Sequence, residues 1–330
     1  MTINFNGTSG ITFPDSTTQN TGAFNGGLAF RNRLINGAMG IWQRGTSWTS
    51  PAYLTYTADR WFVGGNGTTS LSRSTDVPAG YQYSLSTTGT TTQAIGQRIE
   101  AVNCQDLVGQ SVTLSFWLKQ SVGAGTAAIT IQAYFPTASD NYTSITQIGS
   151  TQSITSTSSW AQYSVTFSSL PSGVANGLEI FIVSASSSST TFLTTGVQLE
   201  KGPTATTFDY RPYGTELALC QRYLPCINTI AGNSDFAVGT TTGAGSGAVV
   251  FSFKVTPRTP PTGISVTSVG SFTVTTATVS AVCSAISFSN AGYDGGRLNY
   301  SAGSTFTASQ PVIMYGTAAG GQIQFTGCEL

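Results

Sequence analysis

Histidine is absent from the 330-residue sequence, and charged residues make up only 8% of it. Without histidine the chain cannot form a Ser-His-Asp triad, a Cys-His dyad or a His-ligated metal site, and it lacks the commonest general base. The 13 basic residues equal the 13 acidic ones in number and form no cluster along the sequence. Nucleic-acid binding needs concentrated positive charge, so we exclude it, and we expect no cofactor.

Long apolar runs are missing too, because no stretch approaches the roughly 20 residues of a membrane span. The start of the chain lacks the basic and then apolar pattern of a signal peptide. These absences predict that the protein is made in the cytoplasm of the producing cell and does not insert into a membrane. The cysteines are odd in number, widely spaced and without a Cys-x-x-Cys motif, which favours buried free thiols over a disulfide framework or a metal site. A local Cys220–Cys226 pair stays open. The cysteines are Cys104, Cys220, Cys226, Cys283 and Cys328.

Alternation of apolar and polar residues dominates what is present. Hydrophobic residues make up 39% of the chain and aromatic ones 11%, enough apolar mass to fold. Val112, Leu114, Phe116 and Leu118 alternate with polar residues, and the stretches 128–135, 160–167 and 249–255 repeat the pattern. Short strands separated by glycine-rich turns predict an all-β protein built from β-sandwiches or jelly rolls.

One segment breaks this pattern and divides the chain. Residues 214–223 are helix formers, with Thr215 as the expected N-cap and Pro225 as the stop. We therefore predict an extended arm over 1–27, a jelly-roll β-sandwich over 28–213, a short linker helix over 214–227 and a C-terminal β-sandwich over 228–330. The arm carries too few large apolar residues to bury a core of its own.

Several motifs in order resemble one family. Gly10-Ile11-Thr12-Phe13-Pro14-Asp15, Asn32-Arg33-Leu34-Ile35-Asn36-Gly37 and Trp42-Gln43-Arg44-Gly45 begin the series, and Tyr56-Thr57-Ala58-Asp59-Arg60-Trp61 continues it. Val197 to Pro203, Phe208 to Tyr213 and Glu216 to Tyr223 complete it. Over residues 10–223 the chain resembles tail-fibre and minor virion proteins of bacteriophages that infect cyanobacteria and other aquatic bacteria, with a jelly roll like a carbohydrate-binding module.

The resemblance implies a structural, non-enzymatic homotrimer in the virion, most simply a short tail fibre. Its arm would contact other virion proteins, and its distal part would attach to the host surface, most simply to a glycan. It brings no catalytic residue. A head fibre or capsid decoration protein is the main alternative, and a secreted adhesin is the next. A polysaccharide depolymerase also stays open, since glycoside hydrolysis needs only two carboxylates.

Two loop-like stretches carry aromatic residues suited to stacking on sugars. Tyr293, Asp294, Arg297 and Tyr300 are the candidate receptor-binding residues, because rings, an acid and a base lie there among glycines. Trp48, Tyr53 and Tyr56 are candidate glycan-stacking residues. The alternatives are that the rings cap sandwich edges and that Asp294 pairs with Arg297 across a turn.

The linker helix supplies the expected trimer interface. Its stripe of Leu217, Cys220, Gln221 and Leu224 has no evident place in either sandwich, and three such helices around an axis would bury one another's apolar faces. Upstream, Asp59 and Arg60 stand between Tyr56 and Trp61, a pattern that predicts a local ion pair beside an aromatic core.

Overall fold

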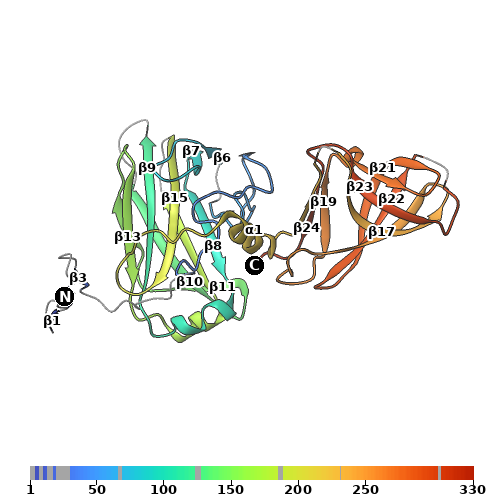
Figure 1. Cartoon of the computed structure of the whole chain (residues 1–330). Helices are drawn as coiled ribbons and strands as arrows, with labels where there is room; N and C mark the ends of the chain where they lie inside the picture. The colour runs from blue at the N-terminus through green and yellow to red at the C-terminus, as the bar shows by residue number, and fades with distance from the viewer. Residues whose placement is uncertain are drawn as a thin grey trace.

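The computed structural model describes residues 4–6, 10–12, 18–19, 30–65, 69–122, 128–184, 189–230, 232–303 and 306–330. It confirms an all-β chain: a two-sheet unit and a smaller β unit lie side by side, joined through one α-helix (Figure 1). Most of the expected arm lies outside the described residues. Within it, three short strands pair antiparallel: β1 (Asn4–Asn6), β2 (Gly10–Thr12) and β3 (Thr18–Gln19).

The first unit is a sandwich of two six-stranded sheets. One sheet has the order β11-β10-β14-β8-β5, with β12 also paired to β10. Its strands are β11 (Asn141–Gln147), β10 (Ala128–Ala138), β14 (Leu178–Ser184), β8 (Gln93–Ile99), β5 (Phe62–Val63) and β12 (Gln152–Thr155). The other sheet has the order β13-β9-β15-β7-β6-β4. Its strands are β13 (Ala161–Phe167), β9 (Val112–Val122), β15 (Thr190–Lys201), β7 (Ser84–Gly89), β6 (Thr69–Ser74) and β4 (Ser47–Thr49).

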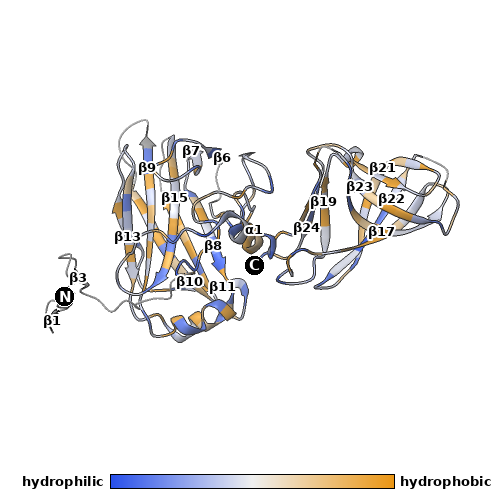
Figure 2. Cartoon of the chain, viewed as in Figure 1, coloured by the Kyte–Doolittle hydropathy of each residue, from blue (hydrophilic) through white to orange (hydrophobic). Residues whose placement is uncertain are grey.

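The core of this unit lies between the two sheets, where the alternation predicted it. Leu114 and Phe116 of β9 are fully buried and share one cluster with Ile180 of β14. Figure 2 shows hydrophobic and hydrophilic residues interleaved along the strands, as period-two patterning requires when one face of a strand is buried. Short 3₁₀ helices complete the described connections: Ala101–Asn103, Gln105–Leu107, Ser172–Asn176 and, in the second unit, Val269–Ser271.

The linker helix α1 spans Tyr213–Gln221. Pro212 occupies its N-cap position and no side chain caps it, so the expectation that Thr215 is the N-cap is wrong. Proline before the first turn costs nothing there, because that N–H has no intrahelical acceptor. None of the described helices is long and apolar enough to cross a membrane.

The helix stripe that was expected to face other copies in a trimer lies partly inside its own chain. Cys220 and Leu224 are each 1% exposed in the single chain, so they are unavailable to a neighbouring copy. Leu217 and Gln221 are half-buried. The stripe as a whole therefore cannot form a trimer axis, because half of it already packs within its own chain. The proposed trimer itself needs another surface.

The second unit is a closed barrel, which corrects the expectation of a C-terminal β-sandwich. Strand β17 pairs with β18 on one side and with β23 on the other, and this pairing closes the circle β17-β18-β22-β21-β20-β23. Its strands are β17 (Ser234–Gly243), β18 (Ser246–Ser252), β20 (Phe272–Thr275), β21 (Ser280–Ala291), β22 (Gly295–Ala302) and β23 (Pro311–Gly316). A three-stranded sheet stands beside it: β16 (Cys226–Asn228), β24 (Gln322–Thr326) and β19 (Gly263–Thr267).

The two units are joined by contacts that cross the linker. The Gln324 side-chain amide of β24 donates to the backbone carbonyl of Gln43 at 2.8 Å. Glu329, beyond β24, pairs with the buried Arg60 of the first unit. Asp59 lies 3.8 Å from Arg44 instead. The predicted local pair of Asp59 with Arg60 is therefore wrong, because each of these neighbours pairs with a residue distant in sequence.

Candidate functional site

The chain has 13 basic residues, and the structure describes all of them. Few of their side chains lack an intramolecular partner. Most form ion pairs: Arg33, Arg44, Arg60, Arg98, Lys119, Lys201, Arg211 and Arg222. Arg31 and Arg258 donate to backbone carbonyls, and Arg73 lies 4.4 Å over the Tyr83 ring. Only Lys254 and Arg297 remain, both exposed and without a partner among the described residues.

The acidic residues also divide into those with an intramolecular partner and those without one. Those of the first unit and linker that the structure describes all accept hydrogen bonds or form ion pairs; Asp140, for example, accepts from the Ala101 N–H at 2.7 Å. In the second unit Asp235 and Asp294 are exposed, and no side-chain partner is present among the described residues. We call Asp235, Lys254, Asp294 and Arg297 the unpaired charges. All of them lie in the barrel unit.

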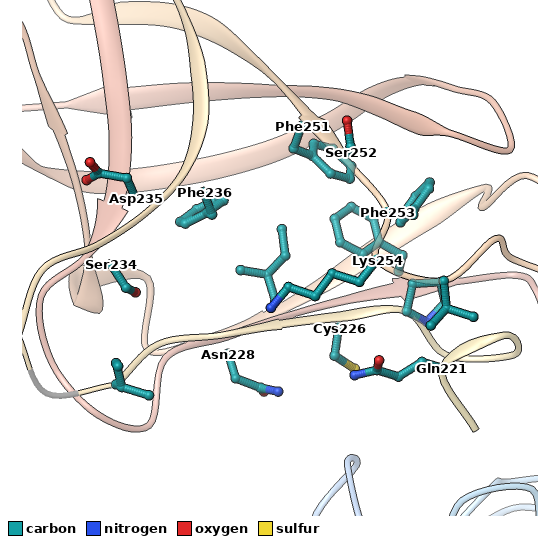
Figure 3. A pocket seen from close by; sticks show the side chains of 15 residues that line it. Gln221, Cys226, Asn228, Ser234, Asp235, Phe236, Phe251, Ser252, Phe253 and Lys254 are labelled. Carbon is teal, nitrogen blue, oxygen red and sulfur yellow. The ribbon is translucent and has the colours of Figure 1, made fainter. Parts of the chain in front are cut away.

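The unpaired charges line two hollows. The first, which we call the aromatic pocket, has a volume of about 340 Å³ and lies between the strand after the linker helix and the barrel strands β17 and β18 (Figure 3). This volume lies within the range of small-ligand sites. Asp235 and Lys254 line it together with four phenylalanines: Phe236, Phe251, Phe253 and Phe325.

The rings of the aromatic pocket hold one another in place. Phe251 stacks on Phe325 with ring centroids 4.7 Å apart, and both are buried. Phe253 meets both edge-on, at 5.2 Å and 5.1 Å. Phe236 packs edge-on against Phe272 of the barrel core at 5.9 Å. Because Phe236 and Phe253 are half-buried, they keep apolar ring surface for a ligand while the buried rings fix their positions.

Lys254 crosses this pocket. It follows β18 in a bend, and Figure 3 shows its side chain running from the Phe253 side across the pocket toward Phe236. Among the polar residues of the lining, Asn228 is already engaged, because its side-chain carbonyl accepts a hydrogen bond from the Gln322 side-chain amide at 2.7 Å. Burial raises the pKa of the Cys226 thiol, so Cys226 is not poised as a nucleophile.

The second hollow, the open groove, adjoins the first. It is lined by residues of β18, the end of β21, the β21–β22 turn and β22: Val250, Phe251, Ser252, Asn290, Asp294, Gly295, Gly296 and Arg297. Phe251 and Ser252 line both hollows. The Phe253 N–H donates to the backbone carbonyl of Asp294 at 2.8 Å, which ties the two rims together. The aromatic pocket and the open groove thus meet across the end of β18.

The structure divides the predicted receptor-binding residues. Tyr293, Asp294 and Arg297 are exposed, and Asp294 and Arg297 line the open groove, with no ion pair between them among the described residues. Tyr300 is 2% exposed and packs inside the barrel, so its assignment as a binding residue is wrong. Its position on β22, two residues after the buried Leu298, places it on the inner face of the strand.

The first aromatic stretch does not form one stacking surface. The ring centroid of Trp48 lies 6.1 Å from that of Trp42, and Trp48 packs against the sandwich core. The Tyr56 ring has the Arg44 guanidinium 5.3 Å from its centroid, and its hydroxyl donates to Leu330. Tyr53 alone of these three is exposed. Trp48 and Tyr56 therefore fit the alternative that these rings cover the sandwich instead of binding a sugar.

Metal and disulfide chemistry find no support in the described part of the chain. It contains no group of His, Cys, Asp or Glu that could hold a metal ion. All five cysteines are free thiols, so Cys220 and Cys226 are not paired. Cys104, Cys220, Cys283 and Cys328 are buried, and burial raises the pKa of the Cys104 thiol to about 12.

Sequence reasoning missed Phe236, Phe253 and Lys254 as site residues. The alternation of Phe251 and Phe253 with polar residues was visible, but it was interpreted only as a strand pattern. The available signal was Lys254, a cation directly after Phe253 and three residues after Phe251 in a chain with 8% charge. The pocket also depends on Gln221 and Phe325, which are distant in sequence.

No protein-family model matches the sequence, and no curated protein does. Solved structures share partial likeness. A putative sugar-binding protein from Bacteroides thetaiotaomicron is 11% identical, with a TM-score of 0.38 over 52% of this chain and 100% of that one. The CBM22-1 xylan-binding domain from Paenibacillus barcinonensis is 15% identical, with a TM-score of 0.35 over 55% and 100%. The enzymatically active domain of tailspike protein 4 of bacteriophage CBA120 is 16% identical, with a TM-score of 0.37 over 52% and 22%. Likeness at these scores and identities assigns no function to this chain.

Proposed function

We propose that this protein is a structural, non-enzymatic attachment protein of a phage virion, a homotrimeric short tail fibre that binds a host-surface glycan through the aromatic pocket. The ordered motifs of residues 10–223 support the virion assignment. One observation carries the binding assignment: half-buried rings and an unpaired lysine share one pocket in the barrel unit.

This combination suits a sugar. The apolar face of a pyranose ring stacks on aromatic side chains, and its hydroxyls bond to nearby polar groups. Phe236 and Phe253 supply the stacking faces, and Lys254 supplies hydrogen-bond donors beside them. Ser252, exposed at the boundary of the two hollows, can donate to or accept from a sugar hydroxyl.

The arrangement of acids favours binding over hydrolysis. A glycosidase needs a carboxylic acid whose pKa is raised, beside a second carboxylate. The described carboxyls whose pKa is raised by burial, Asp59 and Glu179, lie in the sandwich unit next to Arg44 and Arg98. Neither lines the aromatic pocket or the open groove. We therefore propose no depolymerase activity.

The proposed arrangement places the arm at the virion and the barrel toward the host. A head fibre or capsid decoration protein would use the same units at another site on the particle. Labelling purified virions with an antibody against the barrel unit distinguishes these positions. Label at the tail tip supports the short tail fibre, and label over the capsid supports the alternative.

Glycan attachment is tested by blocking the pocket. Ser252→Trp places a large ring at the shared rim without removing a core contact, because Ser252 is exposed. Phe236→Ala with Phe253→Ala removes the stacking faces. We expect either change to abolish binding of the purified protein to host cells, while Tyr213→Ala, an exposed aromatic at the start of the linker helix, leaves binding unchanged. Melting curves establish that each variant is folded. Normal cell binding by folded Ser252→Trp protein contradicts the assignment of the pocket.

A further inference from the structure

The charge of the aromatic pocket is unevenly placed. Lys254 and Asp235 both line it, yet no ion pair joins them in the described structure. Figure 3 shows the Lys254 side chain reaching across the pocket, whereas the Asp235 carboxylate points away from its centre. A ligand seated on the rings therefore meets an ammonium group before it meets a carboxylate.

The surroundings of Lys254 strengthen that difference. The lining of the pocket includes phenylalanine rings and the aliphatic side chains of Ile227 and Val255. Hydrogen bonds between an ammonium and an anion are about twice as strong as neutral ones. Every other lysine in the chain is already paired: Lys119 with Asp76 and Lys201 with Asp106.

The open groove offers different chemistry. Asp294 and Arg297 both line it, so its fixed charges cancel, and Ser252 and Asn290 add uncharged polar groups. Such a surface suits hydroxyls, which donate to a carboxylate and accept from a guanidinium. Val250 in the groove and Lys254 in the pocket are four residues apart, at most about 14 Å along the chain. A short oligosaccharide spans that length.

We infer that the ligand is an acidic oligosaccharide whose anionic sugar occupies the aromatic pocket against Lys254, while its neutral sugars extend along the open groove. This inference rests on the proposed glycan-binding function and specifies its ligand. The anionic group is a carboxylate or a phosphate, since both accept hydrogen bonds from an ammonium.

The test uses surface polysaccharide isolated from the host in its native form, after chemical reduction of its carboxyl groups, and after removal of its phosphates. Binding of each preparation to the full-length chain is measured by calorimetry. We expect one of the two treatments to weaken binding about tenfold or more, the loss that follows from removing a charge-assisted hydrogen bond. Sensitivity to carboxyl reduction identifies a carboxylate, and sensitivity to phosphate removal identifies a phosphate.

Variants assign the effect to Lys254. Lys254→Met keeps the apolar stem and removes the charge, and we expect it to bind native and treated polysaccharide equally weakly. Lys201→Met, which removes a lysine of the sandwich unit, keeps the wild-type preference. If wild-type protein binds native and treated polysaccharide equally, or Lys254→Met retains the preference, the inference is wrong and glycan binding stands. If native polysaccharide does not bind at all, the proposed function fails as well.

Discussion

Arg44 donates a hydrogen bond to Glu329 at 2.7 Å, joining the start of the sandwich unit to the last residues of the chain that follow the barrel. The same carboxylate pairs with Arg60, whose guanidinium is 1% exposed and lies 3.5 Å over the Tyr223 ring. Burial alone would lower the pKa of Arg60, but the charge of Glu329 acts together with Tyr223, Tyr56 and Cys220, and the net effect raises that pKa. A residue after the barrel therefore neutralises a charge buried in the sandwich.

Glu329→Ala tests this joint. Removing one partner of a buried ion pair leaves an uncompensated charge, at a cost of about 3–5 kcal/mol. We expect the variant to unfold at lower denaturant concentration, and small-angle X-ray scattering to show a broader range of distances between the units. Asp106→Asn, which weakens an exposed pair with Arg33, is the control and shifts stability by less than about 1 kcal/mol. A variant as stable and as compact as wild type would show that the joint does not depend on Glu329.

Glu100 makes the linker contact sensitive to acid. Burial raises its pKa, but hydrogen bonds from Arg222 and Tyr223 together with the charges of Arg222 and Arg258 outweigh burial, so the pKa lies below the ordinary value of 4.5. A carboxyl with a lowered pKa stabilises the fold at pH values above 4.5, and this contribution is lost as the pH falls through the folded-state pKa. Glu100→Gln should therefore cost about 1–2 kcal/mol at neutral pH, a modest value because Arg222 is partly exposed.

Denaturant unfolding of wild type and Glu100→Gln at neutral pH and at about pH 3 measures this difference. We expect the difference in stability between the two proteins to narrow at the lower pH, because Glu100 binds a proton more readily in the unfolded chain than in the folded one. A gap that stays constant with pH would assign the effect of the substitution to packing.

The alternation of apolar and polar residues predicted the strands well, but it did not predict that the strands of the second unit close into a barrel. Leu114 and Phe116 lie in the sandwich core as expected, because the period of two is a local property. A sandwich and a barrel have the same local pattern. The barrel is defined by the pairing of β17 with β23, for example Val238 with Ile313, and that pairing spans most of the second unit. No local pattern specifies a partner so distant in sequence.

The candidate site illustrates the same limit. Composition correctly directed attention to rare charges, and Asp294 and Arg297 do line a hollow. Tyr300 was misplaced because the loop was drawn too long: β22 begins at Gly295, and its alternation turns Tyr300 inward. The aromatic pocket was missed because the strand after the linker helix completes it by pairing with β24, which brings Phe325 beside Phe251.

Tyr300→Phe tests the corrected position. The Tyr300 hydroxyl is buried and has no hydrogen-bond partner in the described structure, and burial raises its pKa. Removing a buried unsatisfied hydroxyl is neutral or stabilising by about 1–2 kcal/mol. Tyr300→Ala should instead cost about 3–5 kcal/mol, since it leaves a cavity in the barrel core. Denaturant unfolding measures both. Loss of cell binding by a stable Tyr300→Phe protein would restore Tyr300 as a ligand contact.

Leu224→Ala separates packing within the chain from packing between copies. Leu224 is buried in the single chain, so its truncation should destabilise the fold by about 2–5 kcal/mol and leave the oligomeric state unchanged. Light scattering should give a trimer for both wild type and variant. A stable wild-type monomer would contradict the proposed trimer. A variant that is folded but monomeric would return Leu224 to the trimer interface.

Deletion of residues 1–27 tests the arm as the attachment element. These residues carry few large apolar side chains, and segments of that kind order on a partner surface more readily than they fold alone. The sandwich core begins after them, with Leu34 fully buried. We therefore expect the shortened protein to fold, to assemble as the full-length chain does, and to bind host cells through the aromatic pocket. It should nevertheless be missing from purified virions.

Ser252→Trp is the complementary variant, because the deletion removes the arm and keeps the pocket open. The substitution keeps the arm and blocks the pocket, so virions should incorporate the variant at the normal copy number and fail to adsorb to host cells. Quantitative immunoblotting of purified virions gives the copy number, and an adsorption assay gives attachment. Shortened protein present on virions at the wild-type copy number would place the anchor in the sandwich unit, because the described part of the chain from residue 30 onward would then suffice for incorporation.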